Sequence, residues 1–234
     1  MRTNVIDAVL FDLDDTLFEQ RHWLSGAWLA VADAACGWGI DPDELRRVLN
    51  EVAAEGSDRG RIIDRALERL DATDVPVDAL VDAFRRHRPA TLPPIGGSLE
   101  ALLSLRARVP IALVTDGYPM IQRGKLAALG LNELFDVVVL SDELGRVHRK
   151  PDPLPFQVAL DRLRVAPERA VHVGDRPDKD VAGAAVAGIR AVRVGTGEYR
   201  HLPDRPQAWL SARDVTHAVK LLAPYLARRG SATA

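Results

Sequence analysis

The sequence IDAVLFDLDDT, residues 6–16, joins a short apolar run to a group of aspartates. A nearly continuous apolar run of this length is typical of a strand that is covered on both faces, so we expect a strand over Ile6–Leu13. Residues two apart in a strand share a face, which would let the side chains of Asp12 and Asp14 point the same way. A divalent cation with oxygen ligands, such as Mg2+, would offset the repulsion between two such carboxylates. An isolated pair of this kind is more often a solvated acidic turn, so a metal site needs support from residues elsewhere in the chain.

Similar apolar runs recur along the chain, and helical patterns separate them. We expect strands at Ile111–Thr115, Val137–Ser141, Ala170–Gly174 and Arg190–Val194. We expect helices at Ser98–Ala107, Met120–Leu129, Pro155–Leu163 and Asp180–Ala187, and a closing helix at Asp214–Arg228. This alternation predicts an α/β fold with a Rossmann-like parallel sheet and right-handed crossovers. In such sheets, ligands bind at the carboxyl ends of the strands.

Residues 18–90 interrupt this alternation. They carry no convincing strand pattern but four helical ones, at Arg21–Cys36, Pro42–Ala54, Arg59–Leu70 and Val77–His87. Asp41 before Pro42 is a typical helix start, with a capping carboxylate followed by proline at the first helical position. The stretch 91–97, rich in proline and glycine, then returns the chain to the sheet. The sequence therefore predicts an α/β core domain at 1–17 and 91–234, with an inserted all-helical domain at 18–90.

Residues suited to phosphate and metal binding stand at the ends of the other predicted strands. Thr115 and Asp116 end the second strand, where a hydroxyl and backbone N–H groups can bind phosphate oxygens. Lys150 lies beyond the third strand among prolines, and its ammonium can neutralise phosphoryl charge. Asp175 follows the fourth strand, and Asp180 comes five residues later. Each feature alone also fits an ordinary turn, an exposed loop lysine or an acidic helix start.

Taken together and in this order, these motifs resemble those of a known family. Asp-Leu-Asp-Asp-Thr at 12–16, Thr115 after an apolar strand, Lys150 before Pro-Asp-Pro, and Gly-Asp-x4-Asp at 174–180 are similar to the four motifs of the haloacid-dehalogenase-like superfamily. The resemblance covers nearly the whole chain. The helical insert between the first and second motifs matches the subgroup whose cap domain is inserted there.

The resemblance implies a catalytic role for each aspartate of the first motif. Asp12 would attack phosphorus and form an aspartyl-phosphate. Asp14 would protonate the leaving oxygen and then take a proton from the attacking water. Mg2+ would be held by Asp12, by the backbone carbonyl of Asp14 and by Asp175.

The resemblance also implies which groups would bind the phosphoryl oxygens. Thr115 and Lys150 would hold them, together with backbone N–H groups near Asp14 and Asp116. Asp180 would act beside the metal ligands, orienting Lys150 or a water on the metal.

The expected function is that of a magnesium-dependent phosphatase acting on a small phosphate monoester, such as a sugar phosphate, a nucleoside monophosphate or a phosphorylated organic acid. The cap would select the substrate by closing over the site, with Arg21 and His22 as candidate contacts near the entrance. A phosphomutase with the same aspartate pair is the alternative, and a non-catalytic binding protein is a third. Asp14 argues against a haloacid dehalogenase, which lacks that carboxylate, and the absence of lysine from 18–90 argues against phosphonoacetaldehyde hydrolysis.

Composition limits the remaining possibilities. The formal net charge of -2 gives no broad attraction to nucleic acid or to anionic membranes. Cys36 is the only cysteine, which excludes an intramolecular disulfide and any CxxC site. No apolar stretch approaches the ~20 residues of a membrane span, and the N-terminal run fits a strand better than a signal peptide. We expect a cytoplasmic enzyme with a small phosphorylated metabolite as its partner, either a monomer or a homodimer.

Overall fold

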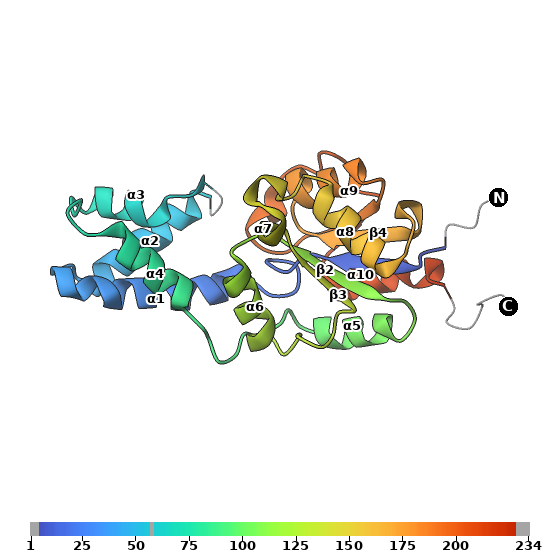
Figure 1. Ribbon diagram of the computed structural model, residues 1–234, viewed down its shortest axis with the longest axis horizontal. Helices are drawn as coiled ribbons and strands as arrows, with labels where there is room; N and C mark the ends of the chain where they lie inside the picture. Colours follow the sequence, from blue (N-terminus) through green and yellow to red (C-terminus); the bar gives the residue numbers. More distant parts are fainter. Residues whose placement is uncertain (1–4, 57–58, 228–234) are drawn as a thin grey trace. The chain divides into compact units, whose positions relative to one another are not determined.

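The computed structural model describes residues 5–56 and 59–227. The chain divides into two compact units (Figure 1). One contains the chain up to Gln20 together with the chain from Thr91 onwards, and the other contains Arg21–Ala90. Within the described residues, no helix combines the length and the apolarity that crossing a membrane requires.

The first unit is built on a parallel sheet. Its strands are β1 (Ala8–Phe11), β2 (Ile111–Thr115), β3 (Val137–Leu140), β4 (Ala170–Gly174), β5 (Arg190–Val194) and β6 (Leu210–Ala212). They lie in the order β3-β2-β1-β4-β5-β6, and every neighbouring pair is parallel. The Rossmann-like α/β fold is therefore confirmed. The chain adds β2 and β3 on one side of β1 and β4 to β6 on the other, so the topological switch point lies between β1 and β4.

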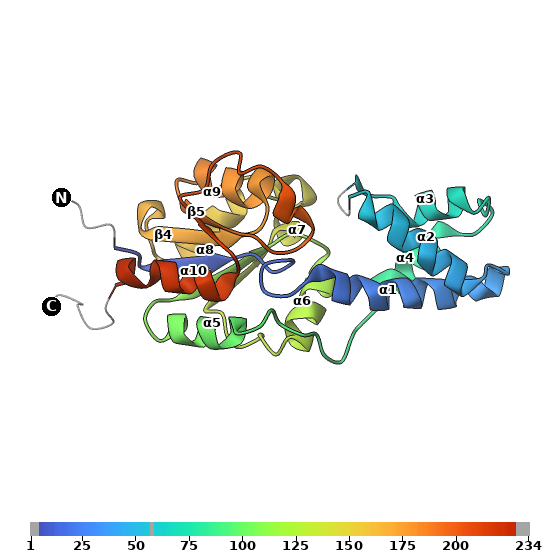
Figure 2. The same cartoon turned by 180° about the vertical axis from the view of Figure 1, so that it is seen from behind.

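Helices cover both faces of the sheet. They are α5 (Ser98–Arg106), α6 (Pro119–Ala128), α7 (Ser141–Leu144), α8 (Leu154–Leu163), α9 (Ala182–Val186) and α10 (Val215–Leu222). Figures 1 and 2 show α5 and α10 side by side below the sheet, with α8 and α9 on the opposite side. Strand residues alternate between the faces. Leu10 and Val114 therefore join the side chains of α8 in one buried apolar cluster, which includes Phe156 and Leu160.

In the sheet unit, three predicted elements differ from those observed by more than one residue. β1 is shorter than Ile6–Leu13 and ends at Phe11. The helix expected over Asp180–Ala187 begins as a π turn at Pro177–Val181 before α9. The closing helix expected over Asp214–Arg228 ends at Leu222, because Pro224 has no N–H to continue it, and a 3-10 turn follows at Ala223–Tyr225. Arg228 lies outside the described residues.

The second unit is all helical over its described residues. It contains α1 (Gln20–Ala35), a 3-10 turn at Cys36–Trp38, α2 (Pro42–Ala54), α3 (Ile62–Arg69) and α4 (Val77–Arg86). The predicted start of α2 is confirmed, because the Asp41 carboxylate accepts hydrogen bonds from the N–H groups of Asp43 and Glu44 at 2.9 and 3.0 Å. All four helices contribute to one apolar cluster, in which Trp28 stacks on Phe84 with ring centroids 4.9 Å apart.

Gly183 provides a test of how α9 packs on the sheet unit. A Cβ added to Gly183 would lie 2.7 Å from the Phe156 ring and 3.1 Å from the Cα of Pro151. Alanine normally stabilises a helix relative to glycine. We nevertheless expect Gly183→Ala to lower the free energy of unfolding by about 1–3 kcal/mol, because it overpacks this contact. Urea unfolding followed by circular dichroism measures the change.

Gly96→Ala is the matched control, because a Cβ there would have nothing within 4 Å. Equal stability of the two variants would show that α9 does not pack against Pro151 and Phe156 as described.

Candidate active site

The carboxyl ends of three adjacent strands bring the predicted motifs together. Asp12 follows β1, Thr115 ends β2, and Asp175 follows β4. Because β1 lies between β2 and β4, these residues meet at the carboxyl end of the sheet, beside the switch point. All three are buried.

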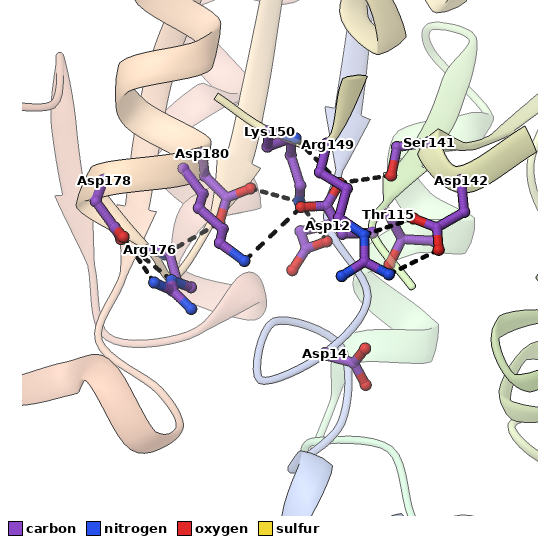
Figure 3. Close-up of polar contacts among 12 residues, drawn as sticks. Asp12, Asp14, Thr115, Ser141, Asp142, Arg149, Lys150, Arg176, Asp178 and Asp180 are labelled. Atoms are coloured by element: carbon purple, nitrogen blue, oxygen red, sulfur yellow. Dashed lines mark hydrogen bonds and ion pairs between the residues drawn. The ribbon is translucent and has the colours of Figure 1, made fainter. Parts of the chain in front are cut away.

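Lys150 is at the centre of this group. Its Nζ lies 2.6 Å from Asp12 Oδ1, 2.7 Å from Asp180 Oδ1 and 3.3 Å from the carbonyl oxygen of Val114 (Figure 3). The three N–H donors of the ammonium thus match three acceptors. Burial alone would lower the pKa of Lys150, but the carboxylates of Asp12 and Asp180 raise it above its ordinary value. Lys150 therefore supplies a fixed positive charge next to Asp12.

Asp116 fixes the segment that carries Lys150. Its Oδ1 accepts hydrogen bonds from Ser141 Oγ at 2.7 Å and from the backbone N–H of Lys150 at 3.1 Å. The Asp116 side chain therefore braces the ends of β2 and β3, and the predicted phosphate contact through backbone N–H groups near it stays a prediction. Next to Lys150, the Arg149 guanidinium donates two hydrogen bonds to Asp142, at 2.5 and 2.6 Å.

Asp180 is held from several sides. Its Oδ1 lies 2.9 Å from His172 Nε2 as well as close to Lys150, and its Oδ2 accepts a hydrogen bond from the backbone N–H of Arg176 at 3.0 Å. A Cβ on Gly174 would overlap the Asp180 carboxyl group, so only glycine permits this close approach. Burial would raise the pKa of Asp180, but Lys150 and His172 lower it below its ordinary value.

His172 is a fully buried residue of β4 that the sequence analysis did not identify. Its ring packs edge-on against Phe156 with centroids 4.9 Å apart. Burial lowers the pKa of His172, which favours the neutral ring. A neutral ring protonated at Nε2 donates a hydrogen bond to Asp180 and so orients that carboxylate.

Three carboxylates gather around Lys150. Asp12, Asp175 and Asp180 each place a carboxylate oxygen within 4.8 Å of the others. Burial raises the pKa of Asp12 to about 7, against the opposing effect of Lys150. Burial and the charges of Asp180 and Asp12 raise the pKa of Asp175 well above its ordinary value. Among the described residues, Asp175 Oδ2 is buried without a hydrogen-bond partner. One ammonium cannot balance three carboxylates, so this all-oxygen set is suited to a divalent cation.

Asp14 does not add its carboxylate to this group. Its Oδ1 accepts a hydrogen bond from Lys125 Nζ at 2.6 Å, and its Oδ2 accepts one from Gln122 Nε2 at 2.9 Å. Figure 3 shows Asp14 on the loop beyond β1, apart from the carboxylates around Lys150. The expectation that Asp12 and Asp14 share a strand face is wrong, because β1 ends at Phe11. A metal contact through the backbone carbonyl of Asp14 stays a prediction.

Thr115 keeps a donor available for a ligand. Its Oγ1 accepts a hydrogen bond from Gln122 Nε2 at 2.8 Å. A hydroxyl that accepts in this way can still donate its own hydrogen. The predicted role of Thr115 in phosphate binding is compatible with this arrangement.

The loop after β5 braces the segment that follows Asp14. The Asp15 carboxylate accepts hydrogen bonds from the N–H groups of Gln20, at 2.9 Å, and Glu198, at 3.3 Å. Its backbone carbonyl accepts one from Thr196 Oγ1. A Cβ on Gly197 would overlap the Asp15 side chain, so the two loops are in close contact.

Arg21 and His22 belong to the helical unit, whereas the residues described above belong to the sheet unit. They lie in the first turn of α1, in the helical unit, and their side chains are exposed. Their contact with a substrate stays a prediction.

Three polar residues that contact Asp14 or Asp180 directly were not identified from the sequence: Gln122, Lys125 and His172. Gln122 and Lys125 are three residues apart on the helix that follows the Thr115 strand, so they share a helix face. The chain has only four lysines, so this spacing was a usable signal. His172 stands inside an apolar strand, and nothing near it in the sequence distinguishes a ligand-orienting histidine from a packed one.

The geometry agrees with comparisons to known proteins. A family model described as haloacid dehalogenase-like hydrolase matches residues 6–188. The chain is 38% identical over 209 residues to glyceraldehyde 3-phosphate phosphatase of Methanopyrus kandleri, covering 86% of this chain and 89% of that protein. It is 41% identical over 155 residues to phosphoserine phosphatase of Thermus thermophilus, covering 65% of this chain and 59% of that protein. The solved structure of a HAD phosphatase from Thermococcus onnurineus is similar with a TM-score of 0.66 and 28% identity, covering 93% of this chain and 98% of that one.

The hydrogen bond from His172 to Asp180 can be tested through stability. We expect His172→Leu to lower the free energy of unfolding by about 1.5–3 kcal/mol, because a buried carboxylate loses a donor. His172→Gln retains an N–H donor and should lose less. Urea unfolding midpoints with unchanged slopes give the comparison. If the Leu and Gln variants are equally stable, the ring does not act as a donor to Asp180.

Proposed function

Because the chain belongs to the haloacid dehalogenase-like hydrolase family, we propose that it is a phosphatase that hydrolyses a small phosphate monoester through a phospho-aspartate at Asp12. The observation that carries this proposal is the position of the Asp12 carboxylate, 2.6 Å from the Lys150 ammonium and beside two further buried carboxylates. A nucleophile, a fixed positive charge and a cation-binding group thus lie together at the carboxyl edge of the sheet. Phosphoryl transfer depends mainly on such positioning and charge stabilisation.

In the first half of the reaction, a carboxylate oxygen of Asp12 attacks phosphorus. The bond between phosphorus and the leaving oxygen breaks, and that oxygen takes the bonding electrons. Asp14 gives its carboxyl proton to the leaving oxygen, so an alcohol departs rather than an alkoxide. Lys150 offsets negative charge near Asp12.

In the second half, water attacks the phosphorus of the phospho-aspartate. Asp14, now ionised, takes a proton from that water. The bond between phosphorus and the Asp12 oxygen breaks, which releases inorganic phosphate and restores both aspartates. The Thr115 hydroxyl, which retains a donor, would bind a phosphoryl oxygen in both halves.

We propose Mg2+ as the cation, held by Asp12 and Asp175, with Asp180 next to them. The unpartnered, buried Asp175 Oδ2 supports this assignment, because a buried carboxylate oxygen normally has a partner. When bound, the ion would offset the charge of the carboxylates and of the phosphoryl oxygens.

The substrate class is narrower than the fold alone implies. The relatives' names give two different small phosphate esters, glyceraldehyde 3-phosphate and phosphoserine. We therefore propose a small phosphorylated metabolite, and we place its selection in the helical unit, with Arg21 and His22 as candidate contacts.

Replacement of the nucleophile tests the proposal. Asp12→Asn should reduce phosphate release from p-nitrophenyl phosphate by about four orders of magnitude or more, because an amide cannot form the phospho-enzyme. Asp161→Asn, at an exposed position of α8, is the control and should be fully active. Near-normal phosphate release by Asp12→Asn would contradict the proposal. Interconversion of phosphate isomers without net phosphate release would identify a phosphomutase, and ligand binding without turnover a binding protein.

Metal dependence has a readout that is independent of turnover. Mg2+ should raise the thermal unfolding midpoint of the wild-type protein, because a ligand that binds only the folded state stabilises it. Asp175→Asn should abolish that rise and, by removing a repelled buried carboxylate, raise the midpoint in the absence of Mg2+. Asp161→Asn should respond as the wild type does.

EDTA should also inactivate the wild-type enzyme, and added Mg2+ should restore its activity. Full activity in excess chelator would remove the metal from the proposal.

A further inference from the structure

One face of α6 is directed at Asp14. Gln122 and Lys125 lie three residues apart on this helix, and both side chains are almost completely buried, at 1% and 3% exposure. Lys125 donates to one carboxylate oxygen of Asp14 and Gln122 to the other, at 2.6 and 2.9 Å. Both oxygens of the proposed proton-transfer group are therefore bound by side chains of one helix.

The start of α6 is fixed next to the phosphate-binding strand end. Gly117, between Thr115 and the helix, has a φ of 129°, which favours glycine. A Cβ there would lie 3.2 Å from the Gln122 side chain, so the turn and the glutamine are packed together. Pro119 then begins the helix, a position that suits proline. This anchoring sets where Gln122 and Lys125 lie relative to β2.

Gln122 links two parts of the site. Its amide nitrogen donates to Asp14 Oδ2 and to Thr115 Oγ1, and the second distance is 2.8 Å. One planar amide thus fixes the carboxylate that moves protons and the hydroxyl that would bind phosphate. A change at Gln122 would disturb the position of Asp14 relative to the phosphoryl group.

We propose that Lys125 and Gln122 are positioning residues for Asp14, holding its carboxylate where it exchanges a proton with the leaving oxygen and with water. The inference rests on the proposed phosphatase function. Neither residue needs to touch the substrate or the reacting atoms. They act by restricting the side chain of Asp14, which lies beyond the end of β1 and whose backbone forms only an isolated bridge to Phe18.

A purely structural role would be an ion pair that anchors α6. The two roles predict different effects of the leaving group on the rate of hydrolysis. p-Nitrophenolate leaves readily without a proton, whereas the more basic phenolate needs one. Loss of a positioned acid therefore slows the hydrolysis of phenyl phosphate more than that of p-nitrophenyl phosphate. Structural damage slows both alike.

The experiment measures kcat/KM for phenyl phosphate and for p-nitrophenyl phosphate with each protein. Lys125→Met should lower the phenyl to p-nitrophenyl ratio by about tenfold or more, within the usual range of general acid catalysis. Gln122→Leu should lower it in the same direction, and Lys125→Arg, which keeps a donor, should restore part of it. Lys220→Met, at an exposed lysine of α10, should leave the ratio unchanged. Partial unfolding cancels in the ratio, because both substrates are tested on one preparation.

A double-variant cycle separates positioning from other effects. Asp14→Asn should lower the ratio as well, and adding Lys125→Met to it should lower the ratio no further, because the two changes disable the same interaction. This double variant also leaves no unpaired buried charge, so it remains measurable if Lys125→Met alone fails to fold.

Several outcomes would overturn the inference. An unchanged ratio in Lys125→Met and Gln122→Leu would do so, as would a further drop in the Asp14→Asn background. Wild-type protein that hydrolyses neither ester would instead contradict the proposed function, and this inference with it. An active wild type with a ratio insensitive to α6 contradicts this inference alone.

Discussion

The buried ammonium of Lys150 is the interaction on which the rest of the site depends. Three carboxylates converge at the edge of the sheet, where burial disfavours their charged forms. Lys150 binds two of them directly, Asp12 and Asp180, and so makes their ionised forms tolerable in that environment. One positive charge still falls short of three negative ones, and this deficit is the physical argument for the proposed divalent cation. A bound phosphoryl group would add further negative charge, which the proposed cation would offset.

The parallel sheet makes this convergence possible. Asp12 and Lys150 are 138 residues apart in sequence, yet the strand order brings β1 and the segment after β3 to the same edge. Local contacts then set the exact positions of the site residues. Asp116 ties the Lys150 segment to the ends of β2 and β3, and Gly174 lets Asp180 approach β4 without a steric clash. Fold and chemistry are thus linked through a few short side-chain contacts rather than through the whole sheet.

Element bounds were predicted most accurately where a single local pattern determines them. The strands Ile111–Thr115, Ala170–Gly174 and Arg190–Val194 match their predicted bounds because they are short apolar runs between clear turn signals. β6 went unpredicted because Leu210–Ala212 is three residues long with one buried side chain, too little for a periodic pattern. The meeting of Asp12, Lys150 and Asp180 followed from the ordered motifs.

The remaining parts of the site depend on tertiary contacts that the sequence does not encode locally. Asp14 turns toward α6 because β1 ends before it and two buried donors face it there. His172 acts on Asp180 only because a strand and a π turn are adjacent in space. Polar residues in apolar surroundings give the same pattern whether they orient a ligand or satisfy a neighbour. Only the interatomic distances in the structure show which group each of these residues contacts.

Trapping of the phospho-enzyme tests the central claim most directly. Acid quenching during turnover, followed by peptide mass spectrometry, should find a phosphoryl group on the peptide that contains Asp12, and hydroxylamine should remove it, as expected for an acyl phosphate. The contrary result would be steady release of phosphate with no phosphoryl group on Asp12 at any quench time. The account would be contradicted if Asp12 also stayed unlabelled in a variant that cannot hydrolyse the phospho-aspartate.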